Sequence, residues 1–198
     1  MDLFNLSAAP DLRKSMLDLA STKAKATRSS IKMQDCTVFS RAGFRGTGAE
    51  AFLASHGIAI PTKPNESLSC QASLVVLRLS RSEFWIISTD NSEHAKIEAL
   101  EVAAMGVENV YPLYCQHSHA CFMLTGAETE NMFSKVCGVD LRNNVFPVGA
   151  VAQTSVARTG AIVTKQTHAQ GDYFLLFADI ASVQYLWEAL TDAAAEFV

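Results

Sequence analysis

Two thiols and two imidazoles alternate along one short stretch of the chain, at Cys115, His117, His119 and Cys121. Alternate residues of a β-strand point to the same face, so all four side chains would lie together if the stretch is extended. A strand rises about 3.3 Å per residue, which places the two thiols roughly 20 Å apart, whereas zinc holds its ligands within about 2.0–2.3 Å. We therefore interpret the stretch as a half-buried strand without metal ligands. A metal site on His117 and His119, completed from elsewhere, is the alternative.

Three glycines, Gly43, Gly46 and Gly48, lie where a predicted strand gives way to a predicted helix. Such turns can cradle a phosphate, but neither G-x-G-x-x-G nor the Lys-Ser/Thr pair of a P-loop follows. The cysteines and histidines also lack a G-x-S-x-G elbow or the surroundings of a cysteine protease. A Cys–His pair from separate segments stays open, yet the sequence favours no catalytic or nucleotide-binding residue.

Composition limits the classes of partner. The chain has 198 residues, 49% of them hydrophobic and 18% charged, which is typical of a globular protein. Its net charge of −4 argues against nucleic-acid binding, which depends on neutralising phosphates. No apolar run approaches the roughly 20 residues that cross a bilayer, and no secretory leader is recognisable. Five cysteines without a C-x-x-C pair indicate reduced thiols. We expect a cytoplasmic protein that contacts neither nucleic acid nor membrane.

The elements that must position these residues are marked by a repeat. Thr47-Gly48-Ala49-Glu50 recurs as Thr125-Gly126-Ala127-Glu128, 78 residues later. Each copy fits a capping box, in which the Thr hydroxyl and the Glu carboxylate satisfy backbone N–H groups. We predict a helix from each box, the first running to about His56 before Gly57 and the second to about Cys137 before Gly138.

Each predicted helix has similar flanks: an extended segment before it, then a proline-containing loop, two extended runs and a second helix. The extended segments are Cys36 to Phe44, Leu74 to Leu79, Phe84 to Ser88, His119 to Leu124, Ala150 to Thr164 and Tyr173 to Phe177. The second helices bury Ile97, Leu100 and Ala104 in the first half and Val183, Leu186, Trp187 and Leu190 in the second. The pattern predicts an α+β fold of two strand-helix-strand-strand-helix repeats, about 31–106 and 107–198. Residues 1–30 are predicted to form a separate N-terminal arm, with a short helix on Leu12, Met16 and Leu19.

Three segments resemble the gamma subunits of heterotetrameric sarcosine oxidases. They are Arg41 to Leu53, Phe146 to Arg158, and Tyr173 to Phe177 followed by Tyr185 to Leu190. These subunits are similar to the folate-binding aminomethyltransferase, the T-protein of the glycine cleavage system. The resemblance covers about residues 31–195. It implies a duplicated α+β domain whose halves exchange strands.

The resemblance also shows which residues are absent. Folate-binding members carry an Arg-Thr-Gly-Tyr-Thr-Gly-Glu motif whose Glu holds the pterin. Here Arg158-Thr159-Gly160 is followed by Ala161, Ile162, Val163 and Thr164, and the span from Leu68 to Leu79 has no acid. Leaving pterin N–H groups unpaired costs about 1–3 kcal/mol each. We therefore expect no folate, and no catalytic, cofactor-binding or metal-binding residues in this chain.

The resulting hypothesis is a non-catalytic gamma subunit. The resemblance implies that FAD, FMN, NAD and tetrahydrofolate lie in partner subunits, named alpha, beta and delta, of a complex that oxidatively demethylates sarcosine to glycine. One alternative is a subunit of a related N-methyl amino acid oxidoreductase. The other is a stand-alone folate-dependent aminomethyltransferase-like protein, which would have to take its carboxylate from Glu66 or Glu83.

Overall fold

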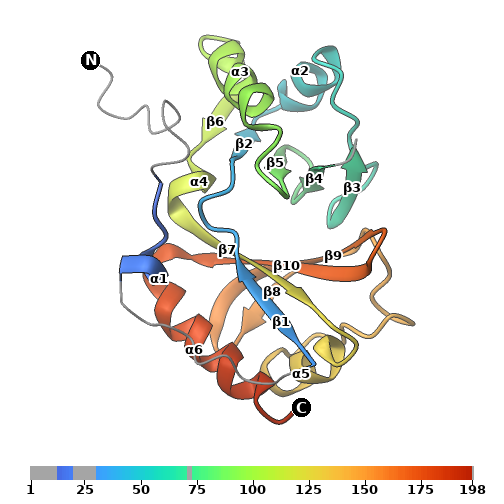
Figure 1. The fold of residues 1–198 in the computed structure, drawn as a ribbon. Helices are drawn as coiled ribbons and strands as arrows, with labels where there is room; N and C mark the ends of the chain where they lie inside the picture. Colours follow the sequence, from blue (N-terminus) through green and yellow to red (C-terminus); the bar gives the residue numbers. More distant parts are fainter. Residues whose placement is uncertain (1–12, 20–29, 71–72, 198) are drawn as a thin grey trace.

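The computed structural model describes residues 13–19, 30–70 and 73–197. Two five-stranded antiparallel sheets form the body (Figure 1). The first sheet has the order β3 (Glu66–Cys70), β4 (Leu74–Arg78), β5 (Glu83–Ser88), β2 (Arg41–Arg45) and β6 (Tyr111–Leu113). The second sheet has the order β8 (Val151–Val156), β9 (Thr159–His168), β10 (Gly171–Asp179), β7 (His119–Thr125) and β1 (Lys32–Asp35).

Helices cover the outer face of each sheet, so the body has four layers. The first sheet packs against α2 (Ala49–Ser55) and α3 (His94–Ala104), and the second against α5 (Thr129–Val136) and α6 (Val183–Ala194). A third apolar cluster fills the space between the sheets. This arrangement confirms the predicted α+β class with helices on one face of each sheet. None of the described helices is long and apolar enough to cross a membrane.

The central strands are apolar along their whole length because both of their faces are covered. In β5, Phe84 and Ile86 join the core beneath the helices, whereas Trp85 and Ile87 face the second sheet. The continuous run Phe84 to Ile87 in the sequence is therefore the signature of a strand buried between two layers.

Two short strands cross from one sheet to the other, and a buried arginine holds the crossing. β1 pairs with β7 in the second sheet, and β6 pairs with β2 in the first. Arg41 lies beside both crossing segments and is 2% exposed. Its guanidinium donates to the backbone carbonyls of Thr37, Phe39, Cys115, Gln116 and His119. These bonds satisfy a charge that no described carboxylate pairs with directly.

The two predicted helix starts are displaced from the repeated tetrapeptide. α2 begins at Ala49 and α5 at Thr129, and neither has a side-chain cap. The predicted capping boxes are therefore wrong. A positive-φ glycine precedes each helix instead, Gly46 at φ +133° and Gly126 at φ +125°. A Cβ at either position would come within about 2 Å of a backbone carbonyl oxygen, so the close approach requires glycine.

Three other expectations about strands need correction. Cys36 to Phe44 is not one extended run, because a turn at residues 37–39 separates β1 from β2. Ala150 to Thr164 is divided into β8 and β9 by a turn in which Ala157 and Arg158 both have positive φ. The short strands β3 and β6 were not predicted. The hairpin of β4 and β5 and the buried positions of α3 and α6 are as predicted, although Trp187 is only partly buried.

The described part of the predicted arm contains one helical turn, α1 (Met16–Leu19). Leu17 packs into the core beneath α6, whereas Met16 is 52% exposed, so the predicted stripe through Met16 is wrong. Leu12 lies outside the described residues, as does the rest of the arm except residues 13–15 and 30.

Candidate functional site

The thiol and imidazole cluster does not form a single strand. Residues Cys115–Ser118 form a one-turn helix, α4, and β7 begins only at His119. Cys115 and Cys121 are buried, and burial raises the pKa of each thiol to about 12. The His119 ring packs edge-on against Trp85 at a centroid distance of 4.8 Å. Both thiols are therefore protonated core groups at neutral pH rather than nucleophiles or metal ligands.

Neither of the two histidines is arranged as a metal ligand. Burial lowers the pKa of His117 and of His119, so both rings are neutral at physiological pH. Within the described ranges, no group of three or more His, Cys, Asp or Glu side chains could hold an ion. The three glycines are also explained by packing. A Cβ at Gly43 would come within 2.9 Å of Leu113, and one at Gly48 within 3.1 Å of the Glu108 carbonyl.

The segment that aligns with the folate-binding motif lies in the interface between the sheets. Arg158 is in the turn before β9, and Thr164, at the position of the missing Glu, is fully buried. The Thr164 hydroxyl lies 2.8 Å from the Ser67 hydroxyl, and the Gln166 side-chain amide donates to both. These groups satisfy one another across β3 and β9, so the segment contributes a polar seam between the sheets.

A cavity of about 540 Å³ opens between the two sheets. Its lining includes Gln34 of β1, Ser73, Asp90, His168 and Tyr173. Asp90 is the one carboxylate among the described lining residues. It is exposed, and hydrogen bonds from Ser92 and Ser73 hold the pKa of its carboxyl below the usual value. The cavity is thus polar, with one ionised acid at its edge.

The sequence did not identify this cavity. Asp90 was predicted only as a helix cap, yet α3 starts at His94 without a side-chain cap. The cavity lining comes from β1, β4, the β9–β10 turn and residues 89–90, which are far apart in the chain. Only the exchange of strands between the sheets brings these segments together.

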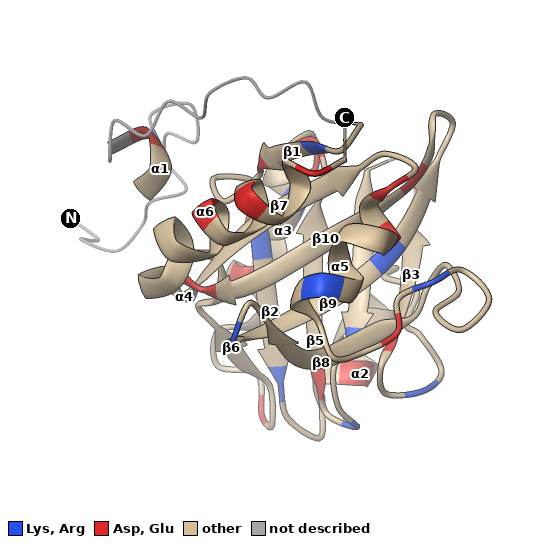
Figure 2. Ribbon diagram, turned by 90° about the horizontal axis from the view of Figure 1, so that it is seen from below, with Lys and Arg blue, Asp and Glu red and all other residues tan. Residues whose placement is uncertain are grey.

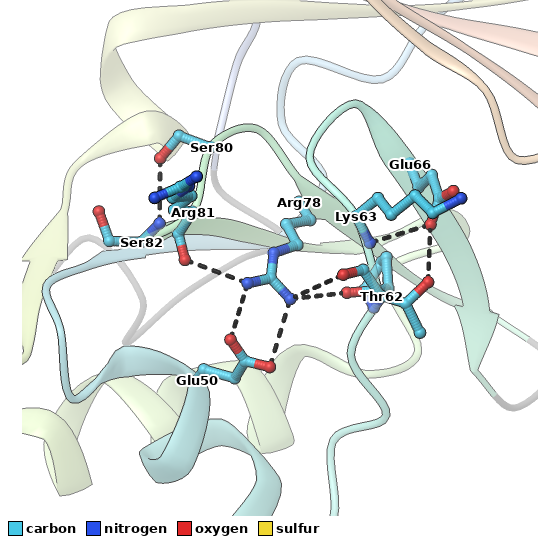
Figure 3. A network of polar contacts seen from close by, with 9 residues as sticks. Glu50, Thr62, Lys63, Glu66, Arg78, Ser80, Arg81 and Ser82 are labelled. Atoms are coloured by element: carbon cyan, nitrogen blue, oxygen red, sulfur yellow. Dashed lines mark hydrogen bonds and ion pairs between the residues drawn. The ribbon is translucent and has the colours of Figure 1, made fainter.

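The two glutamates considered as alternative pterin acceptors do not line the cavity. Glu66 accepts hydrogen bonds from Thr62 and the Lys63 backbone N–H (Figure 3). Glu83 forms an ion pair with Arg45 at 2.6 Å and accepts from the Trp85 indole. Both carboxylates are therefore engaged in local structure.

A buried cation lies beneath the first helix of each sheet. Arg78 of β4 donates to both carboxylate oxygens of Glu50 in α2 and to the carbonyls of Pro61, Thr62 and Arg81 (Figure 3). Its guanidinium carbon lies 5.1 Å from the centre of the Phe84 ring.

The second sheet repeats this arrangement with a lysine. Lys165 of β9 pairs with Glu130 in α5, and its amine lies 5.3 Å from the centre of the Phe174 ring. Glu50 and Glu130 are 80 residues apart, as are Gly46 and Gly126. The spatial match thus differs by two residues from the 78-residue spacing of the repeated tetrapeptide.

Comparison with known proteins gives a family and a set of similar folds. The sequence model of the GCVT N-terminal domain matches residues 62–198. A curated aminomethyltransferase from Streptomyces avermitilis is 24% identical over 184 residues, which is 86% of this chain and 48% of the relative. The chain therefore spans about half the length of that enzyme.

Two solved structures share the fold. One chain of the heterotetrameric sarcosine oxidase from Corynebacterium sp. U-96, in complex with pyrrole 2-carboxylate, superposes with a TM-score of 0.75 and 23% identity. The match covers 94% of this chain and 96% of that chain. The glycine cleavage system aminomethyltransferase T from Bartonella henselae gives a TM-score of 0.59 and 20% identity, over 83% of this chain and 46% of that chain.

Proposed function

The chain belongs to the GCVT N-terminal domain family, and from that premise we propose that it is the non-catalytic gamma subunit of a heterotetrameric sarcosine oxidase. The observation that carries the proposal is the extent of the two structural matches. The chain and a sarcosine oxidase chain cover each other almost completely, whereas the chain covers less than half of the aminomethyltransferase T structure. A protein of this size corresponds to a whole subunit of the oxidase and to a fragment of the transferase.

The chemistry of the cavity supports a role without catalysis. A general acid or base, or a pterin acceptor, acts best from a buried site with a perturbed pKa. Asp90 is exposed, and its hydrogen bonds favour the ionised form. The position equivalent to the motif Glu holds the buried Thr164. We propose that this chain contributes no catalytic, metal or cofactor ligand, and that FAD, FMN, NAD and tetrahydrofolate are bound by partner subunits.

We also propose that the domain is an internal duplication with exchanged strands, with repeats of about 31–106 and 107–198 and residues 1–30 as a separate arm. Three observations support this. The orders β3-β4-β5-β2-β6 and β8-β9-β10-β7-β1 correspond strand by strand. The positive-φ glycines before α2 and α5 correspond, as do the cation, acid and phenylalanine beneath each helix. The exchanged strands are β1 and β6.

The partners would be the alpha, beta and delta subunits of a cytoplasmic complex that demethylates sarcosine in its catabolism. Co-expression of the subunits with and without this chain tests the proposal. We expect the complete set to co-purify as one complex and the set without this chain to assemble poorly or lose turnover. Normal assembly and turnover without this chain would overturn the proposed role. Replacing sarcosine by other N-methyl amino acids in the same assay tests the related oxidoreductases.

The second candidate is a stand-alone folate-dependent one-carbon protein, and the position of Asp90 at the cavity favours it. An exposed carboxylate could accept from pterin N–H groups if the ligand displaced Ser73 and Ser92. Titration of the isolated chain with tetrahydrofolate, followed by Trp85 and Trp187 fluorescence, separates the candidates. Saturable quenching at micromolar ligand would support the enzyme, and an unchanged signal would support the subunit.

A further inference from the structure

We propose that the outer side of α3 and the neighbouring strand β6 form the docking surface for a partner subunit whose contacting surface is apolar with a basic rim. This inference rests on the proposed function and adds to it the surface and the charge of the partner. We define the α3–β6 face as the exposed side chains of Ala99, Val102, Met105, Tyr111 and Tyr114.

The exposed apolar side chains are concentrated at this face. Ten large hydrophobic side chains are exposed among the described residues, and five of them lie within residues 102–114. Tyr114 is 74% exposed, Met105 70% and Val102 60%. Clusters of exposed hydrophobic residues of this kind mark interaction sites, and aromatic residues and Met are enriched at interfaces.

The helix itself is apolar on both sides. Ile97, Leu100 and Ala104 point into the core, while Ala95, Ala99, Val102 and Ala103 are exposed. α6 differs, because its exposed positions include Gln184, Glu188 and Asp192, and Figure 2 shows acidic segments on it. A helix that is apolar all round is normally covered on both sides. α3 therefore has the composition of a helix that lies between two protein layers.

Strand addition does not explain the surface. β6 is an edge strand of three residues, and its central residue is Pro112. Proline lacks the N–H donor that a further strand would need, and it is a common means of protecting an edge. The partner is therefore expected to contact side chains rather than extend the sheet.

The charge of the region indicates the partner. Residues 97–134 contain no Lys or Arg, while Glu98, Glu101 and Glu108 lie beside the apolar side chains. The nearest cations are already balanced, since Arg45 pairs with Glu83 and Arg13 lies near Glu98 and Glu101.

Glu108 is exposed, and its printed contact in the described structure is a hydrogen bond from Asn109. A second copy of the chain would bring like charges together across a symmetric contact. An anionic membrane or a nucleic acid would be repelled. A protein surface carrying Lys or Arg around an apolar centre complements the face.

The test uses the complete set of co-expressed subunits. Val102→Asp and Tyr114→Asp should each lower the amount of complex that co-purifies by about tenfold or more, because a carboxylate would be buried in an apolar contact. Val145→Asp is the matched control, since Val145 is 57% exposed and lies in the loop between α5 and β8. It should leave assembly unchanged. Circular dichroism of each isolated variant verifies folding.

The charge is tested separately with Glu108→Lys, which should weaken assembly with a basic partner rim. Stronger assembly of Glu108→Lys would overturn the predicted charge of the partner. If the wild-type chain assembles and Val102→Asp and Tyr114→Asp assemble equally well, the α3–β6 face is wrong while the proposed function stands. If the wild-type chain does not join the complex, the proposed function itself fails.

Discussion

The two sheets bury a cation in the same place but satisfy it in different ways. Arg78 shares its donors among Glu50 and three backbone carbonyls, and the Glu50 side chain is 51% exposed. Lys165 has a side chain that is only 1% exposed, and its partners are the side chains of Glu130, Asn143 and Asp172. The arginine fork can use several fixed carbonyls, whereas the compact ammonium depends on a carboxylate.

The comparison teaches that similar positions in the two sheets do not have similar costs. Removing one partner of a buried pair leaves an uncompensated charge, which costs more than the pair itself contributes. The second sheet concentrates that risk in Glu130, while the first distributes it over the loop that contains Pro61 and Thr62. The difference can be measured by changing one partner at a time.

Glu130→Gln is expected to have the largest effect. It leaves Lys165 buried with Asn143 at 3.3 Å and Asp172 at 3.7 Å, and should lower the free energy of unfolding by about 3 kcal/mol. Urea denaturation followed by circular dichroism measures this. The double variant Glu130→Gln with Lys165→Met removes the charge and should recover most of the loss. No recovery would contradict the assignment of the cost to the unpaired ammonium.

Arg41→Lys sharpens the comparison with a cation that is satisfied by carbonyls alone. Lysine cannot reach the five carbonyls that Arg41 contacts, so some of them lose their partner inside the crossing. We expect a loss of about 2 kcal/mol. Hydrogen exchange should show increased opening of β1 and β6 relative to β4. Uniform protection across these strands would show that Arg41 does not hold the crossing.

Glu50→Gln should have the smallest effect, about 1 kcal/mol, because Arg78 keeps its bonds to Pro61, Thr62 and Arg81. The half-exposed Glu50 also interacts through solvent, which weakens the pair. The same denaturation assay applies. A loss as large as that of Glu130→Gln would mean that the two sheets depend equally on their acids.

Local patterns predicted the parts of the fold that depend on neighbouring residues. The inward positions Ile97, Leu100 and Ala104 followed from helical spacing, and the hairpin of β4 and β5 followed from two apolar runs with a polar turn. The turn at Ala157 and Arg158 was not predictable in this way. Neither residue is Gly or Asn, although both adopt positive φ.

Long-range relations were harder to predict. The tetrapeptide repeat indicated two similar halves, but its spacing of 78 residues differs from the spacing of 80 between Gly46 and Gly126. Identity of letters therefore gave the right architecture with the wrong register. Asp90 could not be assigned to the cavity, because strands from separate parts of the chain must first pair.

Turnover of the complete complex carrying Asp90→Asn in this chain tests the central claim most directly. The substitution removes the one carboxylate among the described residues that line the cavity. If this chain is not catalytic, the assembled complex should oxidise sarcosine at the wild-type rate, within about twofold. A fall of about 100-fold or more in an intact complex would show that Asp90 takes part in catalysis, and would contradict the account.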